Sequence, residues 1–297
     1  PSRQHEPHAY YFCAAALVLA AGRGLRCGAM KTSFITGATS GIGRAVAWDL
    51  SRKGHHIVVA GRSRDRGTSL VSEIEGSGGT GSFLHVDLGS FESVRRAGEE
   101  FRDRGVTIDV MVNNAGVGMA KGVTGDGFEK HFAINHLGHF LLNHGLQPSF
   151  REGTRMITVA SAVHKRVDGI DFEQVTRKGR SFFRLDEYGV SKLANVLYTA
   201  ELARRHSEWN TYAVHPGFVN TKILPGWLRL LRSARLLTPE QGAATIVYCA
   251  TDPDLDEESG HYYARGARAE PSSAAQDPEL ATELWARSEQ WCGIEWR

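Results

Sequence analysis

The chain has 297 residues, of which 41% are hydrophobic and 23% charged, with 33 glycines and 9 prolines. This composition is that of an ordinary soluble globular protein, and it excludes low-complexity, collagen-like and small disulfide-bonded classes. The net charge of +2 comes from residues 1–30, and the basic and acidic residues after them balance. Charge therefore gives no reason to expect nucleic acid as a partner.

The first thirty residues differ from the rest. Residues 9–22 (AYYFCAAALVLAAG) are mostly apolar, but they are fewer than the roughly 18–20 residues that span a bilayer. Three hypotheses compete: a short membrane anchor or targeting segment, a signal peptide, or sequence translated upstream of a true start at Met30. We favour the last, because the chain starts at Pro1 and Met30 stands just before the first predicted strand.

From residue 31 onward, strand and helix patterns alternate. In chain order, strands are predicted at 31–36, 55–60, 82–86, 108–112, 155–160, 211–214 and 259–263, and they alternate with helices at 41–53, 63–75, 91–101, 126–146, 187–206, from 238, and at 277–290. Such alternation predicts an α/β fold: a single-domain Rossmann-type doubly wound parallel sheet of about seven strands, with helices on both faces. This domain is expected over 31–290, followed by a tail at 291–297.

Cysteine and histidine spacing indicates no metal site. The four cysteines, Cys13, Cys27, Cys249 and Cys292, form no CxxC pair, and we interpret them as free thiols in a reducing compartment. His136 and His139 fall on neighbouring turns of a predicted helix, but no third ligand follows at a metal-site spacing.

A glycine-rich turn, TGATSGIG, joins the first predicted strand to the first helix. Glycines allow a tight turn and a close approach of the backbone to a diphosphate, and the helix N-terminus offers free N–H groups. Such a turn is often only a turn, but its place in a βαβ series favours a nucleotide site. The predicted contacts are Gly37, Thr39, Ser40, Gly41, Ile42 and Gly43.

The end of the second predicted strand indicates which cofactor binds. A carboxylate at this place suits the ribose hydroxyl of NAD, whereas a basic residue suits the 2′-phosphate of NADP. The chain has Arg62 and Ser63 here, and the first acid is Asp65. NADP(H) is therefore favoured over NAD(H), and the alternative is that Arg62 is a solvated loop residue.

Tyr188 and Lys192 stand four residues apart at the start of a predicted helix, so they share one face. A nearby ammonium favours the phenolate, and we expect it to lower the pKa of Tyr188 toward the working range. Ser161 ends a predicted strand, at the edge where doubly wound folds bind ligands. The alternative for Ser161 is a helix or turn cap.

In this order, the glycine turn, Asn113-Asn114-Ala115-Gly116, Ser161, Tyr188 with Lys192, and His215-Pro216-Gly217 resemble the short-chain dehydrogenase/reductase family. The segments FEKHFAINHLGHFLL, YGVSKLAN and TPEQGAATIVYCA resemble its retinol-dehydrogenase and WW-domain-oxidoreductase branch. No WW-type module precedes the fold, and Ala160-Ser161 stands where this branch often has two serines.

The resemblance implies a role for each matching residue. Tyr188 is the expected general acid or base, Lys192 lowers its pKa and holds the nicotinamide ribose, and Ser161 hydrogen-bonds the reacting oxygen. Asn135 is expected to fix a water that links the lysine to solvent. The remaining cofactor contacts that the resemblance implies are Asp87, Leu88, Asn113, Ala115, Gly116, Pro216, Gly217, Val219 and Thr221.

The predicted function is NADP(H)-dependent hydride transfer to or from a small apolar carbonyl or alcohol that is retinoid-, steroid- or aldehyde-like. One alternative is a non-catalytic NADP(H)-binding regulator or scaffold, and another is a membrane-surface protein with secondary activity. Residues 222–237 (KILPGWLRLLRSARLL) are expected to form a substrate lid, to pack on the body, or to rest on a membrane surface. We expect a cytoplasmic protein with possible peripheral membrane contact, and a homodimer that pairs through the helices at 126–146 and 187–206.

Overall fold

The structure is a computed structural model that describes residues 30–177, 185–219, 236–256 and 258–296. The leader (1–29), Thr221 and nearly all of the expected lid lie outside the described residues. The strands are β1 (Thr32–Thr36), β2 (His56–Gly61), β3 (Thr80–His85), β4 (Ile108–Asn113), β5 (Phe150–Val159), β6 (Asn210–His215), β7 (His261–Ala264) and β8 (Ala267–Arg268).

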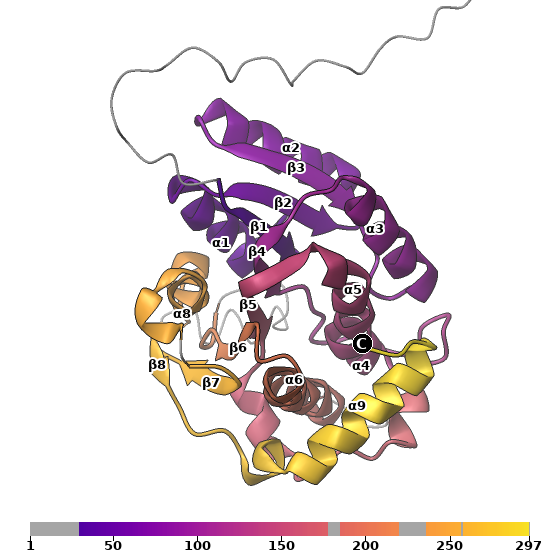
Figure 1. Ribbon diagram of the computed structural model, residues 1–297. Coiled ribbons are helices and arrows are strands. Elements are labelled where there is room, and N and C mark those ends of the chain that lie inside the picture. The colour runs from indigo at the N-terminus through magenta and orange to yellow at the C-terminus, as the bar shows by residue number, and fades with distance from the viewer. Residues whose placement is uncertain (1–29, 178–184, 220–235, 257, 297) are drawn as a thin grey trace, which may run out of the picture.

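Helices separate these strands along the chain and cover both faces of the sheet (Figure 1). The longer ones are α1 (Gly41–Arg52), α2 (Arg64–Gly76), α3 (Phe91–Asp103), α5 (Gly138–Leu146), α6 (Leu185–Arg205), α8 (Pro239–Thr251) and α9 (Pro278–Cys292). A short α4 (Lys130–Phe132) and a π-helical segment (Ala133–Leu137) lead directly into α5.

The eight strands of the described chain form one sheet in the order β3-β2-β1-β4-β5-β6-β7-β8. Neighbouring strands from β3 to β7 are parallel, and only β8 runs antiparallel to β7. The chain winds outward from β1 to β3, then crosses to β4 and winds the other way. This arrangement confirms the predicted doubly wound fold. In such folds ligands bind in a crevice outside the carboxyl ends of the strands where the strand order reverses, which here are β1 and β4.

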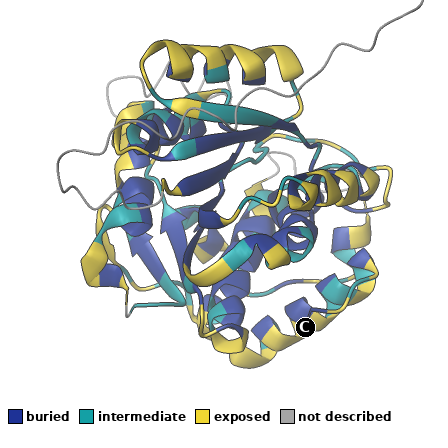
Figure 2. Ribbon diagram, turned by 45° about the horizontal axis from the view of Figure 1, so that its top comes forward, coloured by how far each residue is buried: buried dark blue, intermediate teal, exposed yellow. Residues whose placement is uncertain are grey.

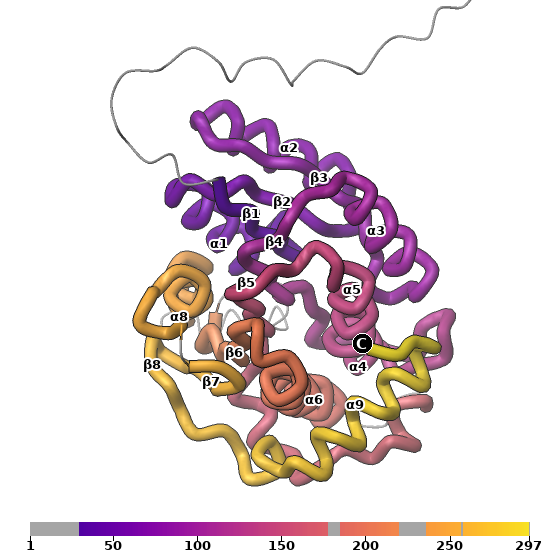
Figure 3. The backbone as a smooth tube through the Cα atoms, viewed as in Figure 1, coloured from indigo at the N-terminus to yellow at the C-terminus, as the bar shows by residue number. Residues whose placement is uncertain are grey.

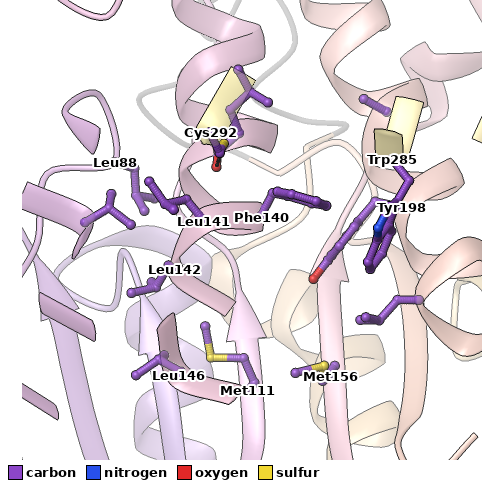
Figure 4. Packing of buried hydrophobic residues seen from close by; sticks show 14 of the residues in the cluster. Leu88, Met111, Phe140, Leu141, Leu142, Leu146, Met156, Tyr198, Trp285 and Cys292 are labelled. Carbon is purple, nitrogen blue, oxygen red and sulfur yellow. Dashed lines mark hydrogen bonds between the residues drawn. The ribbon is translucent and has the colours of Figure 1, made fainter. Parts of the chain in front are cut away.

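The central strands are buried on both faces, as a parallel sheet between helices requires. Successive residues of β1 point to opposite sides, so Phe34 belongs to one hydrophobic core and Ile35 to the other. Figure 2 shows the central strands as buried and the outer faces of the surrounding helices as exposed. In Figure 4, residues of α5 around Phe140 lie between Met111 and Met156 of the sheet and the aromatic pair Tyr198 and Trp285.

Three elements differ most from the sequence prediction. The helix expected from residue 126 begins at Lys130, because the Asp126 carboxylate accepts a hydrogen bond from the backbone of Phe91 instead. Strand β5 starts at Phe150, five residues early, with a register shift against β4. Strand β8 was not predicted, and it forms because the chain turns back after β7 through two positive φ angles, at Arg265 and Gly266.

The C-terminal helix α9 lies across α6 and reaches α5 (Figures 1 and 3). Trp285 of α9 stacks on Tyr198 of α6 and meets Phe140 of α5 edge-on. Helix α9 ends at Cys292, two residues later than predicted, and Trp296 beyond it is buried. Since α9 covers part of both helices through which pairing was expected, it reduces their surface open to a second subunit; the homodimer stays a prediction.

Both cysteines of the described part of the chain, Cys249 and Cys292, are buried free thiols, and Cys13 and Cys27 lie outside it. None of the described helices combines the length and the apolar character that crossing a membrane requires.

Candidate active site

The glycine turn after β1 has the conformation that its sequence predicts. Gly37 and Gly41 have φ angles of 68° and 55°, which side chains disfavour. Gly43 faces the opposite wall of the crevice: a Cβ on it would lie 2.4 Å from Asn114 Nδ2. Asn114 closes the turn by donating from Nδ2 to the Thr36 carbonyl at 2.8 Å. The turn is therefore packed against the segment after β4, with room for backbone only.

The N-terminus of α1 is open to an anion. The N-cap residue, Ser40, makes no side-chain capping bond within the described chain, and the first turn holds no acid. By contrast, the side chains of Ser63, Ser90, Thr238 and Asp277 cap α2, α3, α8 and α9. The first N–H groups of α1 thus stay free to bind a phosphate, which the helix dipole also favours.

The residues expected on the adenosine side lie around the ends of β2, β3 and β4. Arg62 is exposed and forms no ion pair within the described ranges, while Ser63 also accepts a bond from the Arg66 backbone as the cap of α2. Asp87 accepts from the Gly89 backbone at 3.0 Å, and Leu88 is buried against Gly138. Asn113 Oδ1 is buried without a partner in the described residues, so an acceptor is available there. These features fit a dinucleotide.

Ser161, Tyr188, Lys192 and Asn135 converge beside this crevice. Lys192 is buried and donates from Nζ to the Val159 carbonyl at 2.8 Å. Its Nζ lies 5.7 Å from the centre of the Tyr188 ring, and the Ser161 hydroxyl hydrogen-bonds the Tyr188 side chain. A Cβ on Gly116 would lie 3.1 Å from Asn135 Oδ1 and 3.8 Å from Lys192 Nζ, so these groups surround the same glycine.

The pKa of Tyr188 shifts in the direction opposite to the sequence prediction. Burial raises it to about 12, and the hydrogen bond from Ser161 lowers it only in part. Burial also lowers the pKa of Lys192 to about 7. The prediction was wrong because it counted the attraction between phenolate and ammonium and left out the cost of burying either charge. The Lys192 ammonium donates to a carbonyl instead.

The side chain of Asn135 is fully used in holding the site together. Its Oδ1 accepts from the Val117 backbone at 2.8 Å, and its Nδ2 donates to the Val117 carbonyl and to Ser191 Oγ. The Ser191 hydroxyl in turn donates to the Tyr188 carbonyl at 2.8 Å. Asn135 thus ties the loop after β4 to the first turn of α6.

The predicted contacts after β6 are placed close to the glycine turn. Val219 is buried and bridges to Leu237. A Cβ on Gly242 of α8 would lie 2.5 Å from Val219 and 3.3 Å from Ile42. Val219 and Ile42 are therefore both neighbours of Gly242. Gly217, after Pro216, has a φ of 86°.

Ser161 takes the capping role that the sequence allowed, and its side chain also lies beside Tyr188. Its Oγ caps the short 3₁₀ helix that follows β5 by accepting from the Val163 backbone at 3.2 Å, and it also meets Tyr188. A residue that the sequence analysis missed, His164, braces it: His164 Nδ1 lies 2.6 Å from the Ser161 carbonyl, and Nε2 accepts from the Ser272 backbone. Burial lowers the pKa of His164.

A second missed group, His131 with Glu129, lies behind Tyr188. Both side chains are buried, with His131 Nδ1 2.8 Å from Glu129 Oε1. His131 Nε2 accepts from the Ala120 backbone, and its ring meets Tyr188 edge-on at 6.1 Å. The available signal was the spacing: each of these histidines follows its acceptor by two or three residues, as local hydrogen bonds require.

Charged residues at the other end of the sheet are paired with one another. A polar groove there is lined by Asp109, Arg151, Arg155 and Asp256, among others. Arg151 pairs with Asp109, and Arg155 pairs with Asp256. Because these charges neutralise each other, the groove offers no single-sign surface for a charged ligand. Across the described ranges, no three His, Cys, Asp or Glu side chains converge as metal ligands would.

Fold and glycine turn together define a dinucleotide-binding protein of the doubly wound α/β class. Sequence comparison narrows this class. The family model described as short chain dehydrogenase matches residues 31–171. Polyprenol dehydrogenase of Mus musculus is 37% identical over 278 residues, which cover 86% of this chain and 82% of the relative. Retinol dehydrogenase 12 of Mus musculus is 37% identical, with 90% and 87% covered.

Solved structures agree with this assignment. An uncharacterized protein from Mycobacterium paratuberculosis is 32% identical, with a TM-score of 0.75 over 90% of this chain and 95% of that one. A blue fluorescent protein from a metagenomic library, solved in complex with NADPH, is 28% identical, with a TM-score of 0.64 over 79% and 95%. The chain belongs to the short-chain dehydrogenase/reductase family, in its retinol dehydrogenase-like branch. It is therefore an oxidoreductase that uses a nicotinamide cofactor.

Proposed function

We propose that the protein is an NADP(H)-dependent oxidoreductase that interconverts an apolar carbonyl compound and its alcohol. The observation that carries this proposal is the convergence of Ser161, Tyr188, Lys192 and Asn135 beside the open N-terminus of α1. A scaffold protein that only bound the nucleotide would need the glycine turn but not this group of side chains. Retention of the whole group therefore favours catalysis over the regulatory alternative.

The cofactor supplies or accepts the hydride, and the residues of the chain handle the proton. Ser161 holds the substrate oxygen near Tyr188, since its hydroxyl already bonds that side chain. Burial keeps Tyr188 protonated at neutral pH, because its pKa is raised to about 12. A protonated phenol can donate its proton to a carbonyl oxygen, as carbonyl reduction requires. Lys192 would bind the nicotinamide ribose and stabilise the tyrosinate that remains.

Preference for NADP(H) rests on the end of β2. Arg62 is exposed there and has no ion-pair partner in the described chain, and no acidic residue stands between the end of β2 and Asp65. A guanidinium binds a phosphate through two parallel hydrogen bonds, which no ribose hydroxyl can replace. The structural neighbour solved with NADPH supports the same choice.

The apolar nature of the substrate rests on two observations. Large apolar side chains are exposed in the segments that follow β4 and β6 at the carboxyl edge of the sheet: Met119, Val123, Phe218 and Leu237. The relatives named polyprenol dehydrogenase and retinol dehydrogenase 12 carry names of long apolar alcohols. A cytoplasmic location with contact to a membrane surface is compatible with such a substrate and stays a prediction.

The test compares oxidation of NADPH and NADH with a panel of apolar aldehydes and ketones. Wild type is expected to oxidise NADPH faster, and Tyr188→Phe to lose turnover while it still binds NADPH. Tyr198→Phe is the matched control: it also removes a buried phenol hydroxyl from α6, one bonded to Asn143, and it should keep wild-type kcat. NADPH binding without turnover of any compound, in wild type and both variants alike, would support the regulatory alternative instead.

A further inference from the structure

A third buried histidine, His139, joins the glycine turn to Asn135. It lies on α5 and is 2% exposed. Its Nε2 is 2.9 Å from Thr36 Oγ1, at the end of β1, and its Nδ1 is 3.2 Å from the Asn135 backbone carbonyl. The imidazole ring therefore bridges the strand that enters the nucleotide turn and the π-helical segment that carries Asn135.

The bonds around Thr36 determine which ring nitrogen carries the proton. The Thr36 hydroxyl accepts from the backbones of Asn114 and Ala115, at 2.9 and 3.0 Å, which uses both of its lone pairs. It must then donate its one proton, and His139 Nε2 at 2.9 Å is a better acceptor than the Val112 carbonyl at 3.3 Å. With Nε2 as acceptor, the proton is on Nδ1 and points at the Asn135 carbonyl. The reverse tautomer would set a lone pair against that carbonyl oxygen.

The surroundings keep this ring neutral. Burial lowers the pKa of His139 to about 3, with a smaller contribution from the nearby Lys192 charge and against the opposing effect of the hydrogen bond to the Asn135 carbonyl. A cationic ring would have to donate from both nitrogens, but Thr36 has no lone pair left to accept. The hydrogen bonds and the local charge thus agree on one neutral form.

We propose that His139 is a positioning residue that fixes the Asn135 carbonyl relative to the nucleotide turn, and so sets the surroundings of Lys192. The proposal rests on the oxidoreductase function proposed above. His139 touches neither substrate nor reacting atoms; it acts through Asn135 and Thr36. It does not relay protons, because the chain of bonds ends at Thr36 in the backbone N–H groups of Asn114 and Ala115, which keep their protons.

His136, three residues earlier, provides a matched control. It is equally buried, and burial and the neighbouring His139 lower its pKa to about 3 as well. Its Nε2, however, bonds Ser288 of α9 at 3.0 Å, and its ring lies against Phe132 and Tyr198. His136 lies in the π-helical segment that leads into α5. It shares with His139 the burial and the loss of a polar partner on substitution, but it holds the C-terminal helix rather than the site.

Substitutions can separate the two bonds of His139. Asn places its amide near Nδ1 and keeps a donor for Asn135, whereas Gln reaches toward Nε2 and keeps a partner for Thr36. We expect His139→Leu to lower kcat about tenfold and to raise the Kd of NADPH, since each lost bond is worth about a factor of ten. His139→Asn should recover kcat but not the Kd, and His139→Gln should recover the Kd but not kcat.

The pH profile provides a readout that general destabilisation would not move. The Lys192 charge acts on the His139 ring, and Lys192 Nζ and the Asn135 side chain surround the same glycine, Gly116. Loss of the donor on Nδ1 leaves the partial negative charge of the Asn135 carbonyl uncompensated in this region, so we expect it to raise the pKa of Lys192. The limb of kcat that reports Lys192 should therefore move to higher pH in His139→Leu and stay in place in His139→Asn. His136→Leu should lower the melting temperature by a similar amount and leave the profile unchanged. If His139→Leu and His136→Leu behave alike in kcat, Kd and pH profile, the proposal is wrong.

Nitrogen-15 NMR of histidine-labelled wild type tests the proposal without any variant. The His139 signals should show the Nδ1–H tautomer and should not titrate between about pH 8 and about pH 5, against an ordinary pKa near 6.5. An Nε2–H tautomer, or titration near the ordinary value, would overturn the proposal. Together with the turnover assay, this NMR measurement separates the oxidoreductase function from the role of His139. Absence of turnover in wild type would contradict the oxidoreductase function alone, whereas active wild type with the wrong tautomer would contradict only the role of His139.

Discussion

Replacement of Gly43 by alanine tests whether the glycine turn is packed as tightly as the structure shows. In a free helix this change would stabilise by about 1 kcal/mol, because alanine is the better helix former. Here the new Cβ would lie 2.4 Å from Asn114 Nδ2 and 2.5 Å from the Gly37 carbonyl oxygen, where carbon contacts need about 3.5 Å. One side of the turn must therefore move by roughly 1 Å.

The cost follows from what that movement breaks. Displacing Asn114 removes its hydrogen bond to the Thr36 carbonyl, which costs about 1–3 kcal/mol if the carbonyl is left unsatisfied. Overpacking adds about 1–3 kcal/mol, and the helix propensity returns about 1 kcal/mol. We expect a net loss of about 1–5 kcal/mol, and the melting temperature should fall by about 2–4 °C for each kcal/mol lost. The Kd for NADPH should rise at least about tenfold, because the backbone that approaches the diphosphate is displaced.

Gly76→Ala is the control, because Gly76 ends α2 with an ordinary φ and no atom within 4 Å of the added Cβ. It should keep or slightly raise the melting temperature and leave the Kd unchanged. Thermal unfolding and quenching of protein fluorescence by NADPH measure the two effects. If Gly43→Ala matched wild type in both, the close packing of the turn against Asn114, and with it the placement of the phosphate site, would be refuted.

Two further predictions concern the cofactor and the buried lysine. Arg62→Ala should raise KM for NADPH about 10- to 100-fold, as expected for a lost charge-assisted hydrogen bond, and leave KM for NADH unchanged. An equal change in both KM values would show that Arg62 does not select the phosphate. Arg66→Ala, which replaces an exposed arginine of α2, serves as the control. For Lys192, burial lowers the native pKa to about 7 from an ordinary value near 10.5. Between these values the unfolded chain binds a proton that the native state releases, so stability rises with pH. The free energy of unfolding of wild type, measured in urea relative to Lys192→Met, should therefore increase from about pH 7 to about pH 10. A difference that stays constant or falls would contradict the burial of the lysine.

The fold could be predicted from the sequence because each element carries its own signal. Apolar runs such as FIT and HIVVA have the length and pattern of buried parallel strands. The start of the thirteen-residue helix α8 is indicated by the Thr238 capping box. The π-helical segment before α5 has no such local signal. It depends on tertiary contacts made by Asn135 and His139, which periodicity does not reveal.

The site could be predicted only as far as its motifs reach. The spacing of Tyr188 and Lys192 places them on one helix face, and strand-end positions bring Ser161 to the same edge. The direction of the Tyr188 pKa shift could not be predicted, since it depends on how much water the fold excludes. The hydrogen bond between His164 and Ser272, residues 108 positions apart, could not be predicted either. Neither segment carries a sequence pattern that indicates the contact.

Three histidines that the sequence analysis gave no role in the site share one bonding pattern, and it suits a buried site that contains a lysine. His131, His139 and His164 each accept a hydrogen bond at Nε2 and direct Nδ1 toward an oxygen of the site frame. A neutral imidazole offers one donor and one acceptor, so it can join two such groups without placing a charge beside the buried Lys192. A lysine or arginine at the same positions would supply hydrogen-bond donors only, and its charge would shift the pKa of Lys192. With Nε2 already accepting a hydrogen bond, each of the three rings is held as a neutral imidazole, and none adds a charge beside the buried Lys192.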